Sequence, residues 1–417
     1  DYIFLHNEQI TLLYLLIMKR TFISALALMC AISSGYAKDK KKAVEEEGYV
    51  FTPVKELKVT PVKNQNRTGT CWCFSTLSFL ESELIRMGKG EHDLSEMYIV
   101  SQNYKEKGDR YVRLHGKLNF GQGGSCYDVL QAWKDYGIVP EAEMKGLEYG
   151  EDMHVHGELA SFTEAYLNAV VKNPNRKLSP VWKKGYDGIV DAYLGVAPEK
   201  FTYNGKTYTP KSFAAELGLN PDDYVSLTSY THHPFYKEFA IEVEDNWRWS
   251  LSYNLPIDDL MQVFENAINT GYSIAWGSDV SEKGFTRNGI AVMPDIKAME
   301  RAGSDQDHWL GLSSSEKDAE IRKMINKPCQ EIEVTQEMRQ KAYDNYETTD
   351  DHGMHIYGIA KDQTGKKYYM VKNSWGTDNK YQGTWYASEA FVKYKTMNIV
   401  VHKDAIPQAI KDKLGIK

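Results

Sequence analysis

The chain has 417 residues, a formal net charge of −7 and 26% charged residues. This balance argues against the basic surface that nucleic-acid binding requires, so we expect no nucleic-acid partner. The length allows two or three domain-sized units, or one domain with a large insertion. The 42% hydrophobic content and 28 tyrosines supply ample material for a packed core.

The first residues resemble an export signal. Met18-Lys19-Arg20 is followed by an apolar run over 22–32 and by small residues up to Ala37. A positive start, a short apolar core and small residues before a cleavage point are typical of a secretory signal peptide. We therefore expect translation to begin at Met18, cleavage after Ala37, and a periplasmic or extracellular location.

Two alternatives for this segment are weaker. A single transmembrane anchor is disfavoured because Lys19 and Arg20 break the apolar run that begins at Leu12, which leaves it too short to span a bilayer. Lipid modification of Cys30 is disfavoured because Met29 is a poor residue before such a cysteine. We expect no stable membrane insertion once the signal is removed.

By composition, the whole chain divides into six segments, of which the signal region is the first. The predicted divisions are 1–37, upstream extension and signal peptide; 38–56, charged tail; 57–144, helical domain; 145–254, helical insertion; 255–405, β-rich domain; and 406–417, C-terminal tail.

Apolar spacing of three or four residues predicts a helix over Cys71–Met87 and another over Val129–Tyr136, which Gly137 ends. Further helices are predicted at Tyr186–Leu194, Pro210–Leu217 and Ile257–Ile268. The later chain alternates like strands, at 273–276, 355–359, 367–372 and 383–387. Helices first and an antiparallel sheet late predict an α+β class.

Cysteine is the residue that carries the chemistry. Cys71 lies at the predicted start of a helix, where the backbone dipoles lower a thiol pKa and favour the nucleophilic thiolate. The segment 62–75 reads VKNQNRTGTCWCFS. Gln65 lies six residues before Cys71, so its side-chain amide and the Cys71 backbone N–H can form an oxyanion hole.

These residues resemble the nucleophile region of the papain family of cysteine peptidases. Thr68-Gly69-Thr70-Cys71-Trp72 stands where the family has Cys-Gly-Ser-Cys-Trp, and the first of those cysteines is absent. The pair Gly123-Gly124, followed by a helix, resembles the glycines whose backbone binds substrate in extended form.

The other partners of a cysteine nucleophile follow in the expected order. Asp351-His352-Gly353-Met354 resembles the family's Asp-His-Ala-Val, with Gly358 six residues after the histidine. Asn373-Ser374-Trp375-Gly376 matches its asparagine motif. The resemblance implies that His352 exchanges the proton with Cys71, that Asn373 orients the imidazole, and that Trp375 shields that hydrogen bond, with Trp72 supporting the nucleophile.

Other histidines and cysteines are alternative candidates for the base, the nucleophile or a metal site. His355 would face the opposite side of the strand from His352. Cys73 is displaced from the register that Gln65 and Trp72 set on Cys71. The pairs His232/His233 and His154/His156 lack a supporting cysteine or acidic pattern, so we interpret them as surface histidines and expect neither a metal site nor a cofactor.

The pairing of the remaining cysteines stays open. Export would permit disulfides. A catalytic Cys71 leaves only Cys73, Cys126 and Cys329 after removal of the signal peptide, so no complete disulfide framework is implied.

The spacing is similar to one branch of the family. Cys71 lies only 34 residues after the predicted cleavage, which leaves no room for an inhibitory prodomain, and 281 residues separate it from His352. Both features resemble the bleomycin hydrolase and aminopeptidase C branch. Three further segments, YGIVP at 136–140, LPID at 255–258 and WGSDV at 276–280, match that branch.

The resemblance implies a papain-like fold with an N-terminal helical domain, a C-terminal antiparallel β-barrel-like domain and a large, mostly helical insertion. It also implies a homohexamer that removes N-terminal residues from peptides, with a C-terminal carboxylate receiving the substrate's amino group. The sequence departs from this pattern after Asp404, where it continues to Lys417 without the branch's Pro-Trp-Asp-Pro-rich arm.

Three other functions remain as alternatives. The first is endopeptidase activity, and the second is a catalytically silent papain-fold binding protein. A thiol–disulfide oxidoreductase using Cys71 and Cys73 is disfavoured because a one-residue spacer strains the ring.

Overall fold

The computed structural model describes residues 48–297 and 312–417. Tyr49–Lys417 forms one compact unit, and the account below concerns that unit. The predicted signal peptide, its cleavage point at Ala37 and Cys30 lie outside the described residues. Within the described ranges, no helix combines the length and apolarity that crossing a bilayer requires.

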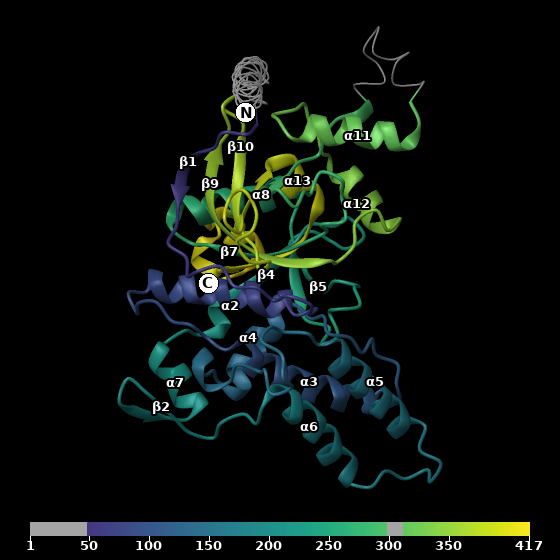
Figure 1. Ribbon diagram of the computed structural model, residues 1–417. Helices are drawn as coiled ribbons and strands as arrows, with labels where there is room; N and C mark the ends of the chain where they lie inside the picture. The colour runs from purple at the N-terminus through teal and green to yellow at the C-terminus, as the bar shows by residue number, and fades with distance from the viewer. Residues whose placement is uncertain (1–47, 298–311) are drawn as a thin grey trace, which may run out of the picture. The chain divides into compact units, whose positions relative to one another are not determined.

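Helix α2 (Cys71–Arg86) lies at the centre of the unit and is buried along almost its whole length. Figure 1 shows other helices on one side of it and the large sheet on the other. The helices on the first side are α3 (Glu96–Arg113), α4 (Cys126–Tyr136), α5 (Gly157–Val171), α6 (Val181–Leu194) and α7 (Pro210–Leu217).

Local sequence signals start and stop these helices. Ser95 caps α3 by accepting the N–H of Tyr98, and at the start of α4 the Asp128 carboxylate accepts the Ser125 N–H at 2.8 Å. Helix α4 ends at Gly137, whose φ of 84° suits glycine. The apolar faces of the helices meet in one core, which includes Phe79, Ile99, Val129, Trp133, Leu159 and Tyr186.

The sheet has ten strands in the described part of the chain. Its strands are β1 (Thr52–Glu56), β4 (Tyr224–Thr228), β5 (Glu238–Ala240), β6 (Leu251–Asn254), β7 (Ile274–Ser278), β8 (Ile290–Ala291), β9 (His352–Lys361), β10 (Lys367–Lys372), β11 (Thr384–Ser388) and β12 (Thr396–His402). The order is β5-β6-β4-β12-β7-β9-β10-β11-β8, and β1 pairs with the second half of β9.

The sheet is mostly antiparallel, with parallel pairing at β4·β6 and β8·β11. Its path is open among the described residues, so the expected barrel-like domain is an open sheet. The remaining short elements are β2 (Phe201–Tyr203), β3 (Lys206–Tyr208), η1 (Glu141–Glu143), η2 (Pro221–Asp223) and η3 (Lys403–Ala405).

Further helices cover the sheet away from α2. Helices α8 (Ile257–Thr270), α13 (Glu389–Lys395) and α14 (Gln408–Leu414) contribute to a second core with the strands, which includes Phe264, Trp276, Tyr369, Phe391, Ile399 and Leu414. Helix α11 (Ser314–Ile325) packs Ile321 and Ile325 with Tyr49 and Tyr368. Helix α12 (Gln336–Asp344) completes the set.

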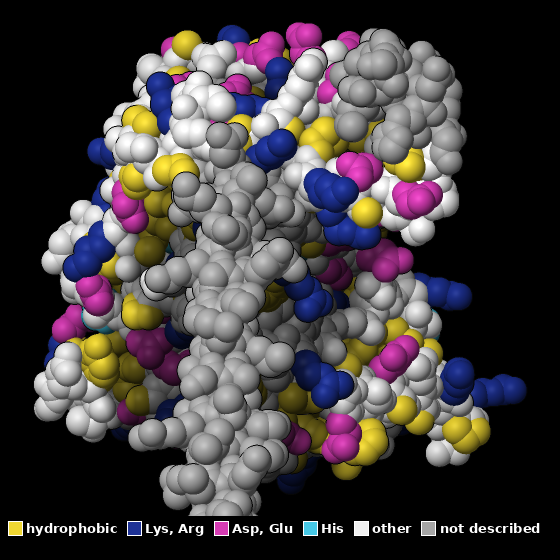
Figure 2. Space-filling view, turned by 45° about the horizontal axis from the view of Figure 1, so that its top comes forward, with side chains coloured by type: hydrophobic (Ala, Val, Ile, Leu, Met, Phe, Trp, Pro, Cys, Tyr) yellow, Lys and Arg dark blue, Asp and Glu magenta, His cyan; other side chains and the backbone are white. Residues whose placement is uncertain are grey.

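The predicted α+β class is confirmed, and each helix or strand segment predicted above overlaps an observed element. The range 145–254 contains α5, α6 and α7 but also β4, β5 and β6, which belong to the large sheet. The C-terminal part of that range therefore lies beside the strands that carry the histidine and asparagine. On the face shown in Figure 2, basic and acidic side chains are interspersed.

Gly358 provides a test of the sheet packing. A Cβ at this position would lie 2.7 Å from the Lys55 carbonyl oxygen and 2.9 Å from Met370 Sδ. We expect Gly358→Ala to lower the free energy of unfolding by about 1–3 kcal/mol, because backbone must move to admit the methyl group. Urea unfolding measures this change.

The matched control is Gly188→Ala, in the exposed middle of α6, where no atom lies within 4 Å of an added Cβ. The free energy of unfolding of this variant should rise by up to about 1 kcal/mol, because alanine is the better helix former. Equal effects of the two substitutions would contradict the predicted role of the close strand contacts.

Candidate active site

Cys71 is the first residue of α2; part of its surface is exposed, but the surrounding protein is dense enough to desolvate its thiol. It borders a cleft that is open to solvent and that Trp72, Gly124 and His352 also line. The helical side contributes Cys71 and the sheet contributes His352. The two residues are 281 positions apart in the sequence and meet at this one cleft.

His352 and Asn373 come from neighbouring strands. His352 begins β9, Asn373 follows β10, and the two strands pair antiparallel. The His352 Nε2 lies 2.8 Å from Asn373 Oδ1, which also accepts the Ser374 N–H at 2.7 Å. Because this amide oxygen can only accept, Nε2 carries the proton and Nδ1 is left as the acceptor.

Two tryptophans border this pair. The Trp375 ring lies 4.6 Å from the His352 ring between centroids, while 37% of Trp375 remains exposed. Trp375 therefore covers the imidazole from the solvent side. Trp72 is buried, and its Nε1 donates to the Gln122 carbonyl at 3.0 Å, which ties the start of α2 to the loop before α4.

Gln65, the predicted oxyanion donor, is buried and is not part of the cavity lining. Its Oε1 accepts from Ser374 Oγ at 2.6 Å, and its Nε2 donates to the Thr68 carbonyl at 2.8 Å. An amide nitrogen has two hydrogens, so one remains for another acceptor. The side chain is thus held by the asparagine motif and by its own loop.

The glycine pair lies under an unexpected carboxylate. A Cβ on Gly123 would meet the Asp245 carboxylate at 2.0–2.3 Å, so Asp245 rests directly on this glycine. Gly124 lines the cavity, and its added Cβ would meet Asp128 and Trp72 at 2.9 and 3.0 Å. A side chain at either position would have to displace Asp245 or crowd Asp128 and Trp72.

A buried ionic cluster holds the segment that carries Asp245. Arg248 Nε binds Asp128 Oδ1 at 2.7 Å, and its other end binds Glu106. Trp247 Nε1 donates to Asp128 Oδ2 at 3.0 Å. These contacts fix residues 245–248 against α3 and α4, and so determine where Asp245 enters the cleft.

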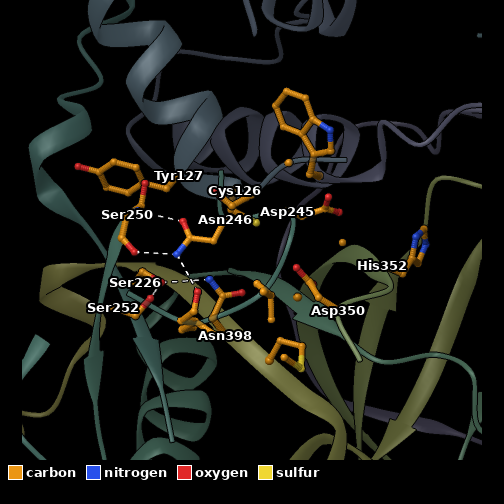
Figure 3. Close-up of a pocket in the computed structure, with 18 of the residues that line it drawn as sticks. Cys126, Tyr127, Ser226, Asp245, Asn246, Ser250, Ser252, Asp350, His352 and Asn398 are labelled. Atoms are coloured by element: carbon orange, nitrogen blue, oxygen red, sulfur yellow. Dashed lines mark hydrogen bonds between the residues drawn. The ribbon is translucent and has the colours of Figure 1, made fainter. Parts of the chain in front are cut away.

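Asp350 reaches the same cavity from the sheet side (Figure 3). Burial raises the pKa of Asp350 to about 7, and the Asp245 and Asp351 carboxyls add to the rise. Burial also raises the pKa of Asp245. Among the described residues, neither carboxylate has a side-chain hydrogen bond or a close ion pair, but the Lys107 ammonium group lies near enough to Asp245 to oppose the rise in its pKa.

The far wall of the cavity is polar and well ordered by hydrogen bonds. Asn246 Nδ2 donates to the carbonyls of Ile241 and Ser250 at 3.0 and 3.1 Å, and Asn398 Nδ2 donates to Ser226 Oγ at 3.1 Å (Figure 3). Leu251 also lines this part. No residue after Asn398 lines the cavity, since α14 packs into the second core instead.

The surroundings of Cys71 and His352 disfavour an isolated charge on either side chain. Burial raises the pKa of the Cys71 thiol to about 12; the Asp350 and Asp245 carboxyls add to the rise, and backbone hydrogen bonds from Gly353 and Trp72 oppose it. Burial lowers the pKa of His352 to about 4, against the hydrogen bond with Asn373. A thiolate at Cys71 therefore depends on His352 taking the proton, because the two new charges then compensate each other.

The competing residues lie elsewhere. His355 is fully buried, and its Nδ1 lies 2.9 Å from Ser78 Oγ. Cys73 is buried with its Sγ 3.4 Å from the Glu96 carbonyl. Neither lines the cavity. The four described cysteines, including Cys126 and Cys329, are free thiols.

The interpretation of four histidines as surface residues is wrong in part. His156 is fully buried, and burial lowers its pKa to about 3. His232 and His233 are partly exposed, but they have an acidic neighbour that was not predicted, Glu242, whose carboxylate contacts both rings. That proximity depends on the chain folding back over nine residues, which no local pattern in the sequence indicates.

The sequence profile of the Peptidase C1-like family matches residues 23–305 and 317–416. The chain belongs to the Peptidase C1-like family. It is a cysteine-type peptidase, its substrates are peptides, and its predicted place in the papain-like aminopeptidase C branch is confirmed.

Similar proteins cover most of the peptidase. It is 24% identical to aminopeptidase C of Streptococcus thermophilus over 416 residues, which cover 88% of this chain and 85% of that protein. It is 20% identical to the mitochondrial cysteine proteinase 1 of Saccharomyces cerevisiae over 422 residues, covering 90% and 81%.

A solved structure supports the fold. The crystal structure of PepW from Lactobacillus rhamnosis aligns with a TM-score of 0.64 at 20% sequence identity, and the alignment covers 87% of this chain and 84% of that one.

The dependence of Cys71 on His352 can be measured by alkylation. We expect His352→Ala to slow iodoacetamide labelling of Cys71 at neutral pH by roughly 100-fold or more, since the thiol then keeps its raised pKa. In the His352→Ala variant, the rate of Cys71 labelling should rise about tenfold per pH unit up to pH ~10, because only the thiolate reacts. A Cys71→Ala control reports labelling of other thiols, and unchanged labelling in His352→Ala would contradict the dependence.

The raised pKa of Asp350 makes a prediction about stability. The unfolded carboxyl titrates near ~3.9 and the folded one near about 7, so the folded state loses stability as pH rises through this window. Asp350→Asn cannot ionise. We expect it to be more stable than the wild type above pH ~7, by at most about 4 kcal/mol, and equal to it below pH ~4.

Denaturant unfolding at several pH values tests this. Asp378→Asn removes the same charge from an exposed position and serves as the control. An Asp350→Asn stability difference that does not vary with pH would show that Asp350 is not the titrating group.

Proposed function

We propose that this peptidase removes residues from the free N-terminus of peptides through a thioester intermediate, with Cys71 as nucleophile. His352 Nδ1 takes the Cys71 proton, and the sulfur attacks the scissile carbonyl carbon. The oxyanion accepts hydrogen bonds from the Cys71 backbone N–H and from Gln65. The tetrahedral adduct collapses, the C–N bond breaks, and the leaving amine receives the proton from His352.

Water completes the cycle. His352 accepts a proton from a water molecule, whose oxygen attacks the thioester carbonyl. The C–S bond then breaks, the N-terminal residue leaves as a carboxylic acid, and the sulfur regains its proton. Asn373 holds the imidazole in one tautomer through both steps, since its Oδ1 accepts only from Nε2.

The observation that supports exopeptidase action is the pair of carboxylates beside the nucleophile. Asp245 and Asp350 line the cavity with Cys71, and their negative charge acts on that sulfur. A protonated α-amino group bound between them would fix the first residue at a set distance from Cys71. Several relatives carry the name aminopeptidase, which agrees with this assignment.

Asp245 also limits the length of substrate on this side. Its carboxylate lies against Gly123, which in the papain resemblance is a place for the substrate backbone. A peptide extending beyond its first residue would have to displace that carboxylate, and the Arg248–Asp128 contact holds the segment in place. The same group thus attracts an N-terminus and obstructs an internal segment.

The amine also alters the nucleophile. Asp350 and Asp245 raise the pKa of the Cys71 thiol when nothing neutralises them. A bound ammonium group cancels part of that negative field, so the substrate's own N-terminus favours ionisation of the sulfur that attacks it. We further propose export of the enzyme after cleavage at Ala37 and assembly as a homohexamer, on the signal-like sequence and the branch resemblance respectively.

The test compares matched peptides with free and acetylated N-termini. The wild type should cleave the free peptide and leave the acetylated one intact, as followed by mass spectrometry. Equal cleavage of both would favour the endopeptidase alternative, and no cleavage of either, with Cys71 unreactive to iodoacetamide, would favour a silent binding protein.

Variants locate the amine site. Asp350→Asn and Asp245→Asn should each lower kcat/KM for the free peptide by about 10- to 100-fold, which corresponds to losing one charged hydrogen bond. Asp378→Asn, on the surface, should leave kcat/KM unchanged. If both cleft variants keep wild-type kcat/KM while acetylation still abolishes cleavage, another group receives the amine.

A further inference from the structure

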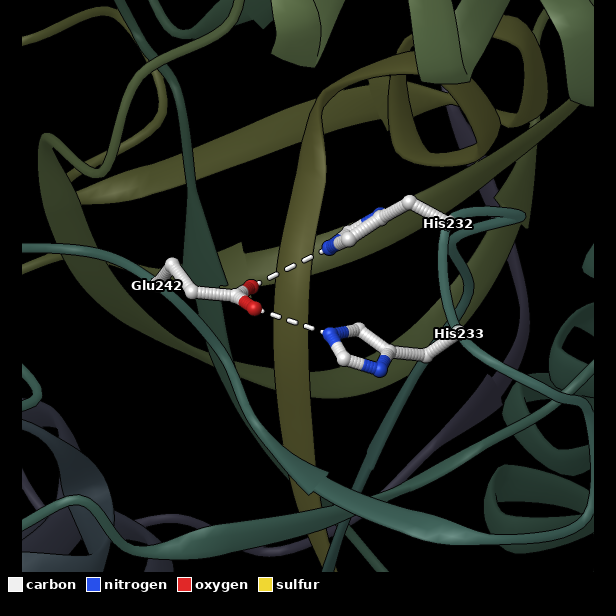
Figure 4. Close-up of side chains that lie close together, drawn as sticks. All are labelled: His232, His233 and Glu242. Carbon is white, nitrogen blue, oxygen red and sulfur yellow. Dashed lines mark hydrogen bonds and ion pairs between the residues drawn. The ribbon is translucent and has the colours of Figure 1, made fainter.

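His232, His233 and Glu242 gather beside strand β5, at the edge of the sheet and apart from Cys71 and His352. His232 Nε2 lies 3.1 Å from Glu242 Oε2, and His233 Nε2 lies 2.8 Å from Glu242 Oε1. Figure 4 shows both rings pointing their Nε2 atoms at the one carboxylate. The ligand atoms of all three residues lie within 4.8 Å of one another.

The backbone around the two histidines is fixed by a buried asparagine. Asn254 Nδ2 donates to the carbonyls of Tyr230 and His233 at 2.7 and 2.9 Å, and Asn254 Oδ1 accepts the Tyr230 N–H at 2.9 Å. Strand β5 then leads the chain back to Glu242. The convergence of the three side chains is therefore built into the fold rather than left to mobile side chains.

The imidazole rings are held by aromatic neighbours. The His233 ring stacks on Phe239 with centroids 4.2 Å apart, and the His232 ring stacks on Tyr343 at 5.4 Å. Such packing restricts ring rotation, so little conformational entropy is lost when a ligand is bound.

The side chain behind His232 suits a metal ligand. Gln340 presents both amide atoms to His232 Nδ1, with Nε2 at 3.1 Å and Oε1 at 3.5 Å. When His232 Nε2 binds a cation, the imidazole proton lies on His232 Nδ1. Gln340 Oε1 then accepts a hydrogen bond from that N–H. A hydrogen bond of this kind on the far ring nitrogen is the usual outer partner of a metal-bound histidine.

We propose that His232, His233 and Glu242 bind a divalent transition-metal ion of the zinc class. Two imidazole nitrogens and one carboxylate oxygen match the preferences of Zn²⁺, while Mg²⁺ and Ca²⁺ prefer oxygen ligands alone. The three side chains are 29%, 35% and 48% exposed, so an ion can enter from solvent and keep water as its fourth ligand.

Occupancy of this site bears on the cleft. The neighbours of Glu242 in the chain, Ile241 and Val243, line the active-site cavity, and Asp245 follows two residues later. An ion that ties Glu242 to the 232–233 turn restrains this wall of the cavity. The site is distinct from the peptidase chemistry, so its test does not depend on the proposed function.

The experiment is calorimetric titration of the full chain carrying Cys71→Ser, which removes the cleft thiolate as a competing zinc ligand. Zn²⁺ should bind with a stoichiometry of one per chain at this site, and Mg²⁺ should not. His232→Gln, His233→Gln and Glu242→Gln should each weaken that binding by more than about 100-fold, and Gln340→Ala, behind the ligand, by about 10-fold.

The control is His115→Asn, an exposed histidine outside the cluster at a positive φ of 54° that asparagine tolerates. It should bind Zn²⁺ as the parent does. A second readout is amide hydrogen exchange, which should slow over 241–246 on adding Zn²⁺ in the parent and not in Glu242→Gln. Unchanged zinc affinity in the three ligand variants, or no saturable binding in the parent, would overturn the proposal.

Discussion

The contact between α2 and β9 determines whether this chain has an active site. Cys71 and His352 each begin one of these elements, so the packing of the helix on the strand sets their separation. Gly353 makes the approach possible, since a Cβ there would lie 2.7 Å from Ser75 Oγ and 3.2 Å from Trp72 Cα. An alanine there would require Ser75 and the start of α2 to shift slightly, and a bulkier side chain would widen the separation of Cys71 and His352.

Around that contact, hydrogen bonds between the sequence motifs hold the other candidate site residues in place. Ser374 links Gln65 to the asparagine loop, and Asn373 links that loop to His352. The predicted oxyanion donor and the predicted base are therefore positioned by the same two residues. Displacement of this loop would disturb the imidazole and the oxyanion donor together, which explains why these side chains occur as one set.

The parts of this site that depend on neighbouring residues could be predicted from the sequence. The parts that depend on contacts between distant segments could not. Helix α2, the strand of His352 and the asparagine motif follow from apolar spacing and short motifs. Helix α3 was missed because its charged residues interrupt the apolar spacing, although Ser95 marks its start. Asp245 could not be predicted, because its place over Gly123 depends on the buried contacts of Arg248 with α3 and α4. Asp350 directly precedes the Asp351-His352 motif, so its closeness to His352 follows from the sequence, but its burial does not.

The two carboxylates, Asp245 and Asp350, present an apparent conflict with the chemistry of Cys71. Negative charge beside a cysteine disfavours the thiolate on which catalysis depends, so a site selected only for nucleophile strength would not contain Asp245 and Asp350. Their presence is reasonable when the substrate itself brings a positive charge, because the ammonium group then satisfies both carboxylates and relieves the sulfur. An acetylated or internal peptide segment offers no such charge, and it leaves the cleft in its less reactive state. Substrate selection and nucleophile activation are then the same electrostatic event.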